Sequence, residues 1–263
     1  TNCVCSNSFN FFHICKSYAI DRSGSMGQHT RFLYGIVHLV IDEYGNQEAK
    51  EMYVTSVNLG KKDSIQRLGN GNIQTGIKKR PTDHRVNVNW RGLVGDAIIN
   101  TKHHGGPDQA VYLYREEDYR YWCIRLNRDL PYGVFGENLT ITGLPSPYLN
   151  IGDKLIFDDL SIEVTAPRIP CSTLAARMND KFFPKKFLEA ELPGIYCRVL
   201  QTGSINNNDK FYIDDYVGDR ISTREFFRDL LSEISKRQIQ RYLRLPIDIR
   251  SRKKLDKDLK RLE

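Results

Sequence analysis

One cysteine stands in a setting that an ordinary core cysteine does not need, in the stretch "VTAPRIPCSTL" at residues 164–174. Pro170 fixes the backbone directly before Cys171 and biases Ile169 towards extended geometry. Residues 172–180 have helical composition, so Cys171 is predicted near a helix N-terminus. There the helix dipole favours the thiolate, and so does Arg168 if its side chain turns inward. A thiolate suits a nucleophile or a soft-metal ligand. A buried cysteine at a strand–helix junction is the alternative, and this stretch alone does not decide between them.

A second group of candidate residues lies in "KHHGG" at residues 102–106, in a predicted loop ahead of a strand. Gly105 and Gly106 allow the backbone to approach a ligand closely, while Lys102 and an imidazole offer donors suited to phosphate or another anion. The two histidines could also bind a metal, although no carboxylate or third histidine follows at ligand spacing, or the segment could be a plain turn. A weaker signal is Glu137-Asn138, which follows a glycine at a predicted strand start.

The elements that must position these residues are mostly short strands. β-branched and aromatic runs bounded by Gly, Pro, Asn or Asp predict strands at 53–58, 85–90, 109–114, 138–142, 154–157, 160–165 and 195–201. The stretch "GDKLIFDDLSIEV" is typical of a hairpin with Asp158-Asp159 at its turn. One clear helix is predicted at 115–130, with Tyr119, Trp122, Cys123 and Leu126 on its buried face. Many short strands without regular strand–helix alternation favour a mainly β barrel or sandwich.

After residue 218 the pattern becomes helical. Capping boxes begin at Ser222 and Ser235, and Ser251 precedes a third apolar repeat. We therefore expect a small C-terminal three-helix appendage at 222–263. The formal net charge of +7 lies in this region, since residues 236–263 hold 11 Lys/Arg against 4 Asp/Glu. Such a tail could bind nucleic acid or an acidic partner, but the solvated face of a helical unit is the favoured interpretation, so nucleic acid is not an expected partner.

Several function classes are disfavoured by missing patterns. The sequence has no GxSxG, GxxxxGK[ST] or GxGxxG motif and no CxxC pair among its six cysteines. Free thiols without a recognisable secretory signal indicate the cytoplasm, and the apolar run at 32–41 is too short for a membrane span. Residues 1–51 have no clear period, and one hypothesis is that the native protein begins at Met52; the alternative is a natural N-terminus with little order.

Taken together, five short motifs are far more specific than any one of them: "GLVGD" (92–96), "HGGPDQAV" (104–111), "FGENLT" (135–140), "IGD" (151–153) and "PRIPC" (167–171). Their order and spacing resemble the MOSC family, named for the C-terminal domain of molybdenum cofactor sulfurase, in its stand-alone bacterial, YiiM-like type. The resemblance extends from about residue 53 to the end and leaves 1–51 unmatched. A departure is the run Asn206-Asn-Asn-Asp209, where the family usually has Gly-Asp.

The resemblance implies a MOSC-type β-barrel over residues 52–221 that binds the molybdenum cofactor (molybdopterin). Cys171 would be the protein ligand to molybdenum and the catalytic residue. The cofactor-binding residues would be Lys102, His104, Gly105, Gly106, Asn138 and Arg168, with Arg168, Lys102 and His104 on the phosphate and pyran side and Asn138 lining the pocket.

Family members of this type reduce N-hydroxylated bases and related N-oxygenated compounds to amines, so a molybdenum-dependent oxidoreductase is expected. Without clustered cysteines or a nucleotide motif, an external electron-donor reductase would be required as partner. Three alternatives remain open. Cys171 could carry sulfur or the cofactor without turnover, or Cys171 and His104 could form a thiol hydrolase or transferase. The third alternative is nucleic-acid binding by the basic tail.

Overall fold

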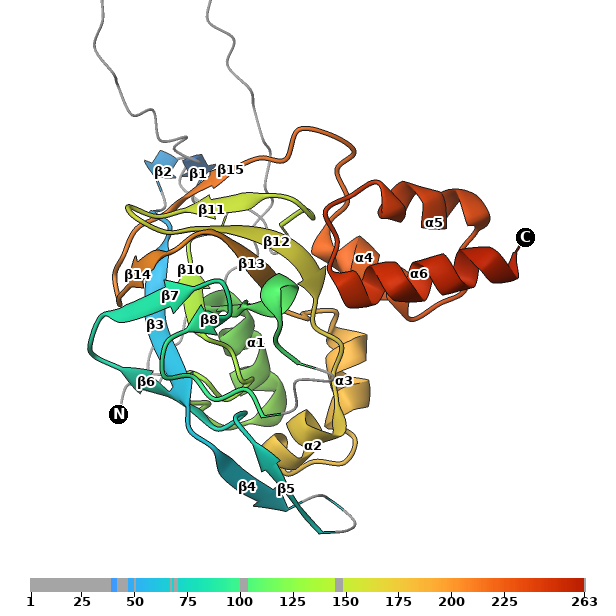
Figure 1. The fold of residues 1–263 in the computed structure, drawn as a ribbon. Coiled ribbons are helices and arrows are strands. Elements are labelled where there is room, and N and C mark those ends of the chain that lie inside the picture. The colour runs from blue at the N-terminus through green and yellow to red at the C-terminus, as the bar shows by residue number, and fades with distance from the viewer. Residues whose placement is uncertain are drawn as a thin grey trace, which may run out of the picture.

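The computed structural model describes residues 39–41, 47–49, 51–66, 68, 71–99, 104–144 and 149–262, and Figure 1 shows the arrangement of their elements. The strands are β1 (Leu39–Ile41), β2 (Gln47–Ala49), β3 (Tyr53–Gly60), β4 (Asp63–Gln66), β5 (Asn72–Thr75), β6 (Lys79–Thr82), β7 (Val86–Asn89), β8 (Gly92–Leu93), β9 (Val111–Arg115), β10 (Leu139–Thr142), β11 (Lys154–Ile156), β12 (Ser161–Pro167), β13 (Ile195–Gln201), β14 (Gly203–Ile205) and β15 (Tyr212–Asp214). The helices are η1 (Pro107–Gln109), α1 (Glu116–Leu126), α2 (Ser172–Met178), α3 (Phe183–Ala190), α4 (Thr223–Leu230), α5 (Lys236–Leu243) and α6 (Ile249–Arg261).

The main sheet has eight strands in the order β15-β11-β12-β13-β9-β10-β3-β6, antiparallel except between β9 and β10. The expected barrel is wrong in one respect, because within the described residues β6 and β15 do not pair and the sheet stays open. Pro81 lies within β6 opposite Asn58, and a residue without an amide donor is typical of an edge strand. The start of β3 instead meets the segment before β15 through a bridge between Tyr53 and Lys210.

The seven strands predicted from short apolar runs are all present, with ends shifted by a few residues. The predicted hairpin is confirmed, since β11 and β12 are antiparallel and the Phe157 amide donates to the Leu160 carbonyl at 2.9 Å. The shorter strands β4, β5, β6, β8, β14 and β15 were not predicted. They have two to four residues and several are largely polar, so hydrophobic alternation has too few positions to show.

Helix α1 confirms the predicted amphipathic segment and buries Tyr119, Trp122 and Cys123. It packs with α3, which the sequence did not predict, in a largely aromatic cluster. In that cluster Trp122 stacks on Phe187 at 6.0 Å between ring centroids. The aromatic cluster fixes α1 and α3 beside the strands that carry the candidate site.

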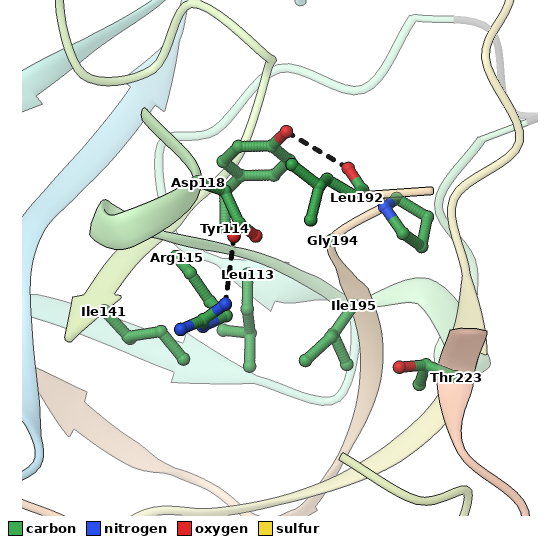
Figure 2. Close-up of a pocket in the computed structure, with 10 residues that line it drawn as sticks. Leu113, Tyr114, Arg115, Asp118, Ile141, Leu192, Gly194, Ile195 and Thr223 are labelled. Carbon is green, nitrogen blue, oxygen red and sulfur yellow. Dashed lines mark hydrogen bonds and ion pairs between the residues drawn. The ribbon is translucent and has the colours of Figure 1, made fainter. Parts of the chain in front are cut away.

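The link between β9 and α1 is a tight, buried corner. Figure 2 shows Arg115 reaching Asp118, with Nη1 2.9 Å from Oδ1, and the Tyr114 hydroxyl directed at the Leu192 carbonyl, 3.1 Å away. Burial raises the pKa of Asp118 to about 7, against the opposing charge of Arg115. The hollow between these side chains measures about 10 Å³, room for one water molecule and not for a ligand.

Three helices, α4 to α6, follow the strands, and Figure 1 draws them together beside the sheet. The predicted caps at Ser222 and Ser235 are confirmed, since each hydroxyl accepts an amide hydrogen bond from the third residue onward. The third helix is capped by Asp248, whose carboxylate accepts from the amides of Arg250 and Ser251, and Ser251 lies within its first turn. Asp248 therefore fixes the start of α6.

The C-terminal helices share a hydrophobic core with the sheet. The apolar cluster that contains the main strands also contains Phe226, Ile239, Tyr242 and Leu255. The expected appendage is therefore not set apart by a core of its own, and the predicted division at residues 221 and 222 stays a prediction. The predicted N-terminal extension, residues 1–51, lies almost entirely outside the described residues.

Candidate functional site

A cavity of about 660 Å³ opens beside the start of α2. Its walls come from residues within five segments that the fold brings together (73–79, 96–99, 104–109, 136–138 and 168–173) and from Tyr112 and Tyr196. Of the residues that the sequence singled out, five line this cavity: His104, Gly105, Asn138, Arg168 and Cys171. Gly106 adjoins the lining without belonging to it, and Lys102 lies outside the described residues.

Cys171 is the last residue of the short link between β12 and α2. It is the N-cap of α2 in extended conformation, with φ −131° and ψ 168°, the backbone region typical of helix N-caps. Burial raises the pKa of its thiol, but a hydrogen bond with the His104 imidazole, the Arg168 charge and the Leu174 amide together lower it to about 6. At neutral pH Cys171 is therefore mainly a thiolate, the form that can ligate a soft metal or attack an electrophile.

Arg168 is a buried cation in the cavity wall, with 4% of its surface exposed. Its Nη1 donates to the Phe135 carbonyl, and its guanidinium lies 5.0 Å from the centre of the Tyr112 ring. Among the described residues its buried Nε has no hydrogen-bond partner. A buried guanidinium with an unused donor is a site that an anionic ligand would complete.

The segment that carries His104 packs closely against Ile98, another residue of the cavity wall. Gly105 has φ 68°, and a Cβ there would lie 2.8 Å from Cγ2 of Ile98, so only glycine fits. Gly106 also has positive φ, at 87°, but no atom within 4 Å would meet its Cβ. The first glycine is therefore required both by close approach and by backbone conformation, the second by conformation.

A buried ion pair in the cavity wall was not predicted. The Lys79 ammonium contacts the Asp96 carboxylate, which also accepts the Gly60 amide at 2.8 Å and the Asn138 side-chain amide at 2.9 Å. Burial lowers the pKa of Lys79, and the Asp96 charge opposes that shift. Asp96 belongs to the "GLVGD" motif, one of the five on which the family resemblance rests, whereas Lys79 stands in a polar run that contains no recognised motif.

Asn138 has a largely structural position. Its Oδ1 accepts the Tyr112 amide at 3.1 Å while its Nδ2 is bound to Asp96, so its side chain already has partners on both sides. The neighbouring Glu137 is fully buried, accepts from Tyr119, Gly133 and Thr140, and does not line the cavity. "FGENLT" thus supports the cavity wall more than it offers free groups to a ligand.

Two tyrosines form an aromatic wall that the sequence did not reveal. The rings of Tyr112 and Tyr196 lie 4.9 Å apart and both line the cavity. Burial raises the pKa of both hydroxyls, so they stay protonated at neutral pH. The two residues are paired across β9 and β13, and only the sheet register brings them together.

A second cavity, of about 490 Å³, reaches Cys171 from another side. It shares Cys171 and Ser172 with the first cavity and is otherwise lined by Leu68, Pro170, Ala175, Lys181 and Pro184. Cys171 therefore stands where two cavities meet, one with buried polar groups and one with mainly apolar walls.

Within the described residues, no group of three or more His, Cys, Asp or Glu side chains is placed to hold a metal ion. The cavity offers one soft ligand, Cys171, and not a complete protein coordination shell. In the same part of the chain, we find no helix with the length and apolar character needed to cross a membrane.

Comparison with known proteins places the chain in a family. The MOSC domain model matches residues 100–212. The uncharacterized protein YflK of Bacillus subtilis is 38% identical over 153 residues, which cover 58% of this chain and 69% of YflK. A protein named Reductase from Gibberella moniliformis is 33% identical over 144 residues (53% of this chain), and YiiM of Escherichia coli is 36% identical over 101 residues (37% of this chain). The chain spans only 25% and 45% of these last two relatives.

Solved structures show the same fold. The crystal structure of YiiM from Geobacillus stearothermophilus superposes with a TM-score of 0.65 at 26% identity, over 79% of this chain and 99% of that one. YiiM from Escherichia coli gives a TM-score of 0.63 at 21% identity over 81% and 94%, a likeness of fold. The chain belongs to the MOSC domain family and is similar to its YiiM members.

Proposed function

We propose that the protein is a molybdenum-cofactor-dependent oxidoreductase that reduces N-hydroxylated bases or related N-oxygenated compounds, with Cys171 as the protein ligand to molybdenum. Family membership and the reductase-named relative support the reaction class. The observation that carries the proposal is the Cys171 thiol, held as thiolate at the edge of a 660 Å³ cavity beside the buried Arg168.

The residues present fit such a cofactor. Arg168 keeps an unpartnered buried Nε suited to the anionic part of the cofactor. Gly105 lets the backbone approach closely, and Tyr112 and Tyr196 provide a flat wall for a fused ring system. Cys171 supplies the soft sulfur that molybdenum accepts. These four features occur in one cavity, and none of them requires a protein metal cluster.

When bound, the cofactor would supply two-electron reduction, so that the N–O bond of the substrate breaks and, with two electrons and two protons, the amine and water leave. The residues of this chain would bind and orient the cofactor and the substrate. Cys171 would hold the metal, and His104 and Arg168 would favour the thiolate form of its sulfur. The second cavity, which also reaches Cys171, is the approach that we propose for the substrate. We further propose an external reductase as electron donor.

The cysteines bear on the compartment. Within the described residues Cys123, Cys171 and Cys197 are free thiols, which a reducing environment preserves. We therefore propose that the protein works in the cytoplasm.

Turnover tests the proposed reaction. Protein loaded with cofactor and supplied with a dithionite-reduced viologen dye should convert an N-hydroxylated amidine or purine base to the same base without the N-hydroxyl group. One molecule of product should form for every two electrons that the dye gives up. The turnover rate of the Cys171→Ser variant should be at least about tenfold lower, because a hydroxyl is a poor ligand for a soft metal. Equal rates in both proteins, or turnover by protein without molybdenum, would refute the proposal.

A carrier function is the second candidate, because the same thiolate is reachable from both cavities. In that case the Cys171 thiolate would attack the outer sulfur of a donor persulfide, whose S–S bond breaks and whose own thiolate leaves, or Cys171 would hold the cofactor for transfer. Loaded protein would then pass labelled sulfur or cofactor to an acceptor protein and would not oxidise the reduced dye with any N-hydroxylated compound. Dye oxidation coupled to amine formation would exclude a role limited to carriage.

A further inference from the structure

The C-terminal helix α6 reaches the cavity through one side chain. Arg250, in the first turn of α6, donates from Nη1 to the Gly105 carbonyl at 2.9 Å and to Oε1 of Gln109 at 2.6 Å. Its Nη2 donates to the His104 carbonyl at 3.3 Å. One guanidinium thus binds three points of the 104–109 segment, 141 to 146 residues away in sequence.

A second contact fixes the same helix turn to the same segment. The Ile249 amide donates to Oδ2 of Asp108 at 2.8 Å, and Arg198 forms an ion pair with Oδ1 of Asp108 at 3.1 Å. The Asp248 amide donates to the Thr165 carbonyl on β12, which places the start of α6 against the sheet. Arg250 therefore extends from a fixed base and not from a loose helix end.

The 104–109 segment needs such support. Its own backbone contributes the bond from the Gln109 amide to the Gly106 carbonyl, and two of its residues are glycines with positive φ. Glycine leaves the backbone many alternative conformations, so external bonds to the carbonyls have a large effect on which one is adopted. His104, at the start of this segment, lines the same cavity as Cys171, and its imidazole is one of the groups that lower the pKa of the Cys171 thiol.

We propose that Arg250 is a positioning residue of the site: by holding the carbonyls of His104 and Gly105 it places the His104 imidazole against Cys171, so that α6 is a working part of the cavity. The inference rests on the proposed function for what Cys171 does, but the placement itself can be measured without turnover. Arg250 acts through His104 and does not touch the reacting groups.

The test uses the full-length protein without cofactor and follows alkylation of Cys171 by iodoacetamide at about pH 5, with the modified peptide quantified by mass spectrometry. Arg250→Met should slow alkylation roughly threefold to tenfold, because the 104–109 segment loses three hydrogen bonds and the His104 imidazole is no longer held on the Cys171 side of the cavity. Arg250→Lys should lie between the two, since an ammonium reaches one carbonyl but cannot bridge three acceptors. The lysine variant also gives an answer if the methionine variant fails to fold.

Arg252 provides the matched control, two residues onward in the same helix. It donates to the carbonyls of Leu243 and Leu245 at 2.7 Å each, and not to the 104–109 segment. Arg252→Met should therefore leave the alkylation rate of Cys171 as in the unchanged protein. A comparable slowing in this variant would mean that loss of α6 packing, and not Arg250, is responsible.

A double-mutant cycle identifies the route of the effect. In a His104→Ala background, Arg250→Met should cause no further change in alkylation rate, because the imidazole that Arg250 places is gone. A full additional slowing in that background, or an unchanged rate for Arg250→Met alone, would overturn the inference. Failure of the proposed reductase activity would leave these rates untouched, so the two failures are distinguishable.

Discussion

At the scale of single residues, the chemistry of Cys171 is set by its neighbours. The thiol is partly buried, which by itself disfavours the charged form, yet its pKa is lowered to about 6 by His104, Arg168 and the first turn of α2. Cys197, buried without such partners, has its pKa raised well above the ordinary value for a cysteine. The same side chain is thus protonated at neutral pH in one place and mainly ionised in the other.

Arg168 allows a direct test at this scale. Arg168→Lys keeps the charge but loses the planar group that faces both the Phe135 carbonyl and the Tyr112 ring. We expect free molybdopterin to bind about tenfold more weakly, the loss of roughly one charged hydrogen bond. Titration followed by pterin fluorescence measures this. Arg177→Lys, on α2 but outside the cavity lining, is the control, and equal affinity in both variants would contradict the assigned role.

At the scale of elements, the start of α6 matters more than its composition suggests. Asp248 is buried and caps two amides, whereas Ser235 is exposed and caps one. Asp248→Ala should lower the free energy of unfolding by about 1–2 kcal/mol and Ser235→Ala by about 1 kcal/mol or less. Urea denaturation measures both. A larger loss for the serine variant would contradict the view that α6 is fixed at its first residue.

The corner between β9 and α1 gives a pH-dependent prediction. Burial raises the pKa of Asp118 from its ordinary value of 3.8 to about 7. Between these values the folded chain holds a proton that the unfolded chain has lost, so the free energy of unfolding falls as pH rises. The slope from this group reaches about 1.4 kcal/mol per pH unit. The contribution of protonated Asp118 to stability is therefore present in full below about pH 4 and lost above about pH 7.

Asp118→Asn removes that titration. The difference in unfolding free energy between the unchanged protein and this variant should therefore decline steadily from pH 4 to pH 7, as measured by urea denaturation at each pH. Parallel pH profiles for the two proteins would show that Asp118 is ionised throughout. The corner would then be held by a simple ion pair with Arg115.

At the scale of the whole molecule, the C-terminal helices belong to both the core and the site. A chain that ends at residue 222 loses Phe226, Ile239, Tyr242 and Leu255 from the shared core. Each such side chain stabilises the fold by roughly 2–3 kcal/mol, and together they approach the whole stability of a domain. The truncated protein should lack a cooperative thermal transition. If it melts like the full chain, the helices are independent of the sheet.

What the sequence could predict follows from the range of the interactions. The placement of Cys171 at the start of a helix, the hairpin at residues 158–159 and the caps at Ser222 and Ser235 depend on near neighbours, and these predictions were confirmed. Lys79 and Arg250 reach the site only because strands and helices far apart in sequence come together, and neither stands in a recognisable pattern. The open sheet was missed for the same reason, since edge pairing is decided by the whole strand order.

The central claim is that Cys171 anchors molybdenum in this cavity. The most direct test is the molybdenum and pterin content of purified protein from a host that makes the cofactor, for the unchanged chain, for Cys171→Ser and for Cys123→Ser. Cys123 is a buried thiol on α1 outside the cavity lining, so its variant controls for loss of a sulfur atom. We predict about one molybdenum per chain in the unchanged and Cys123→Ser proteins and at least about tenfold less in Cys171→Ser. Equal molybdenum in all three proteins, or none in any, would contradict the account.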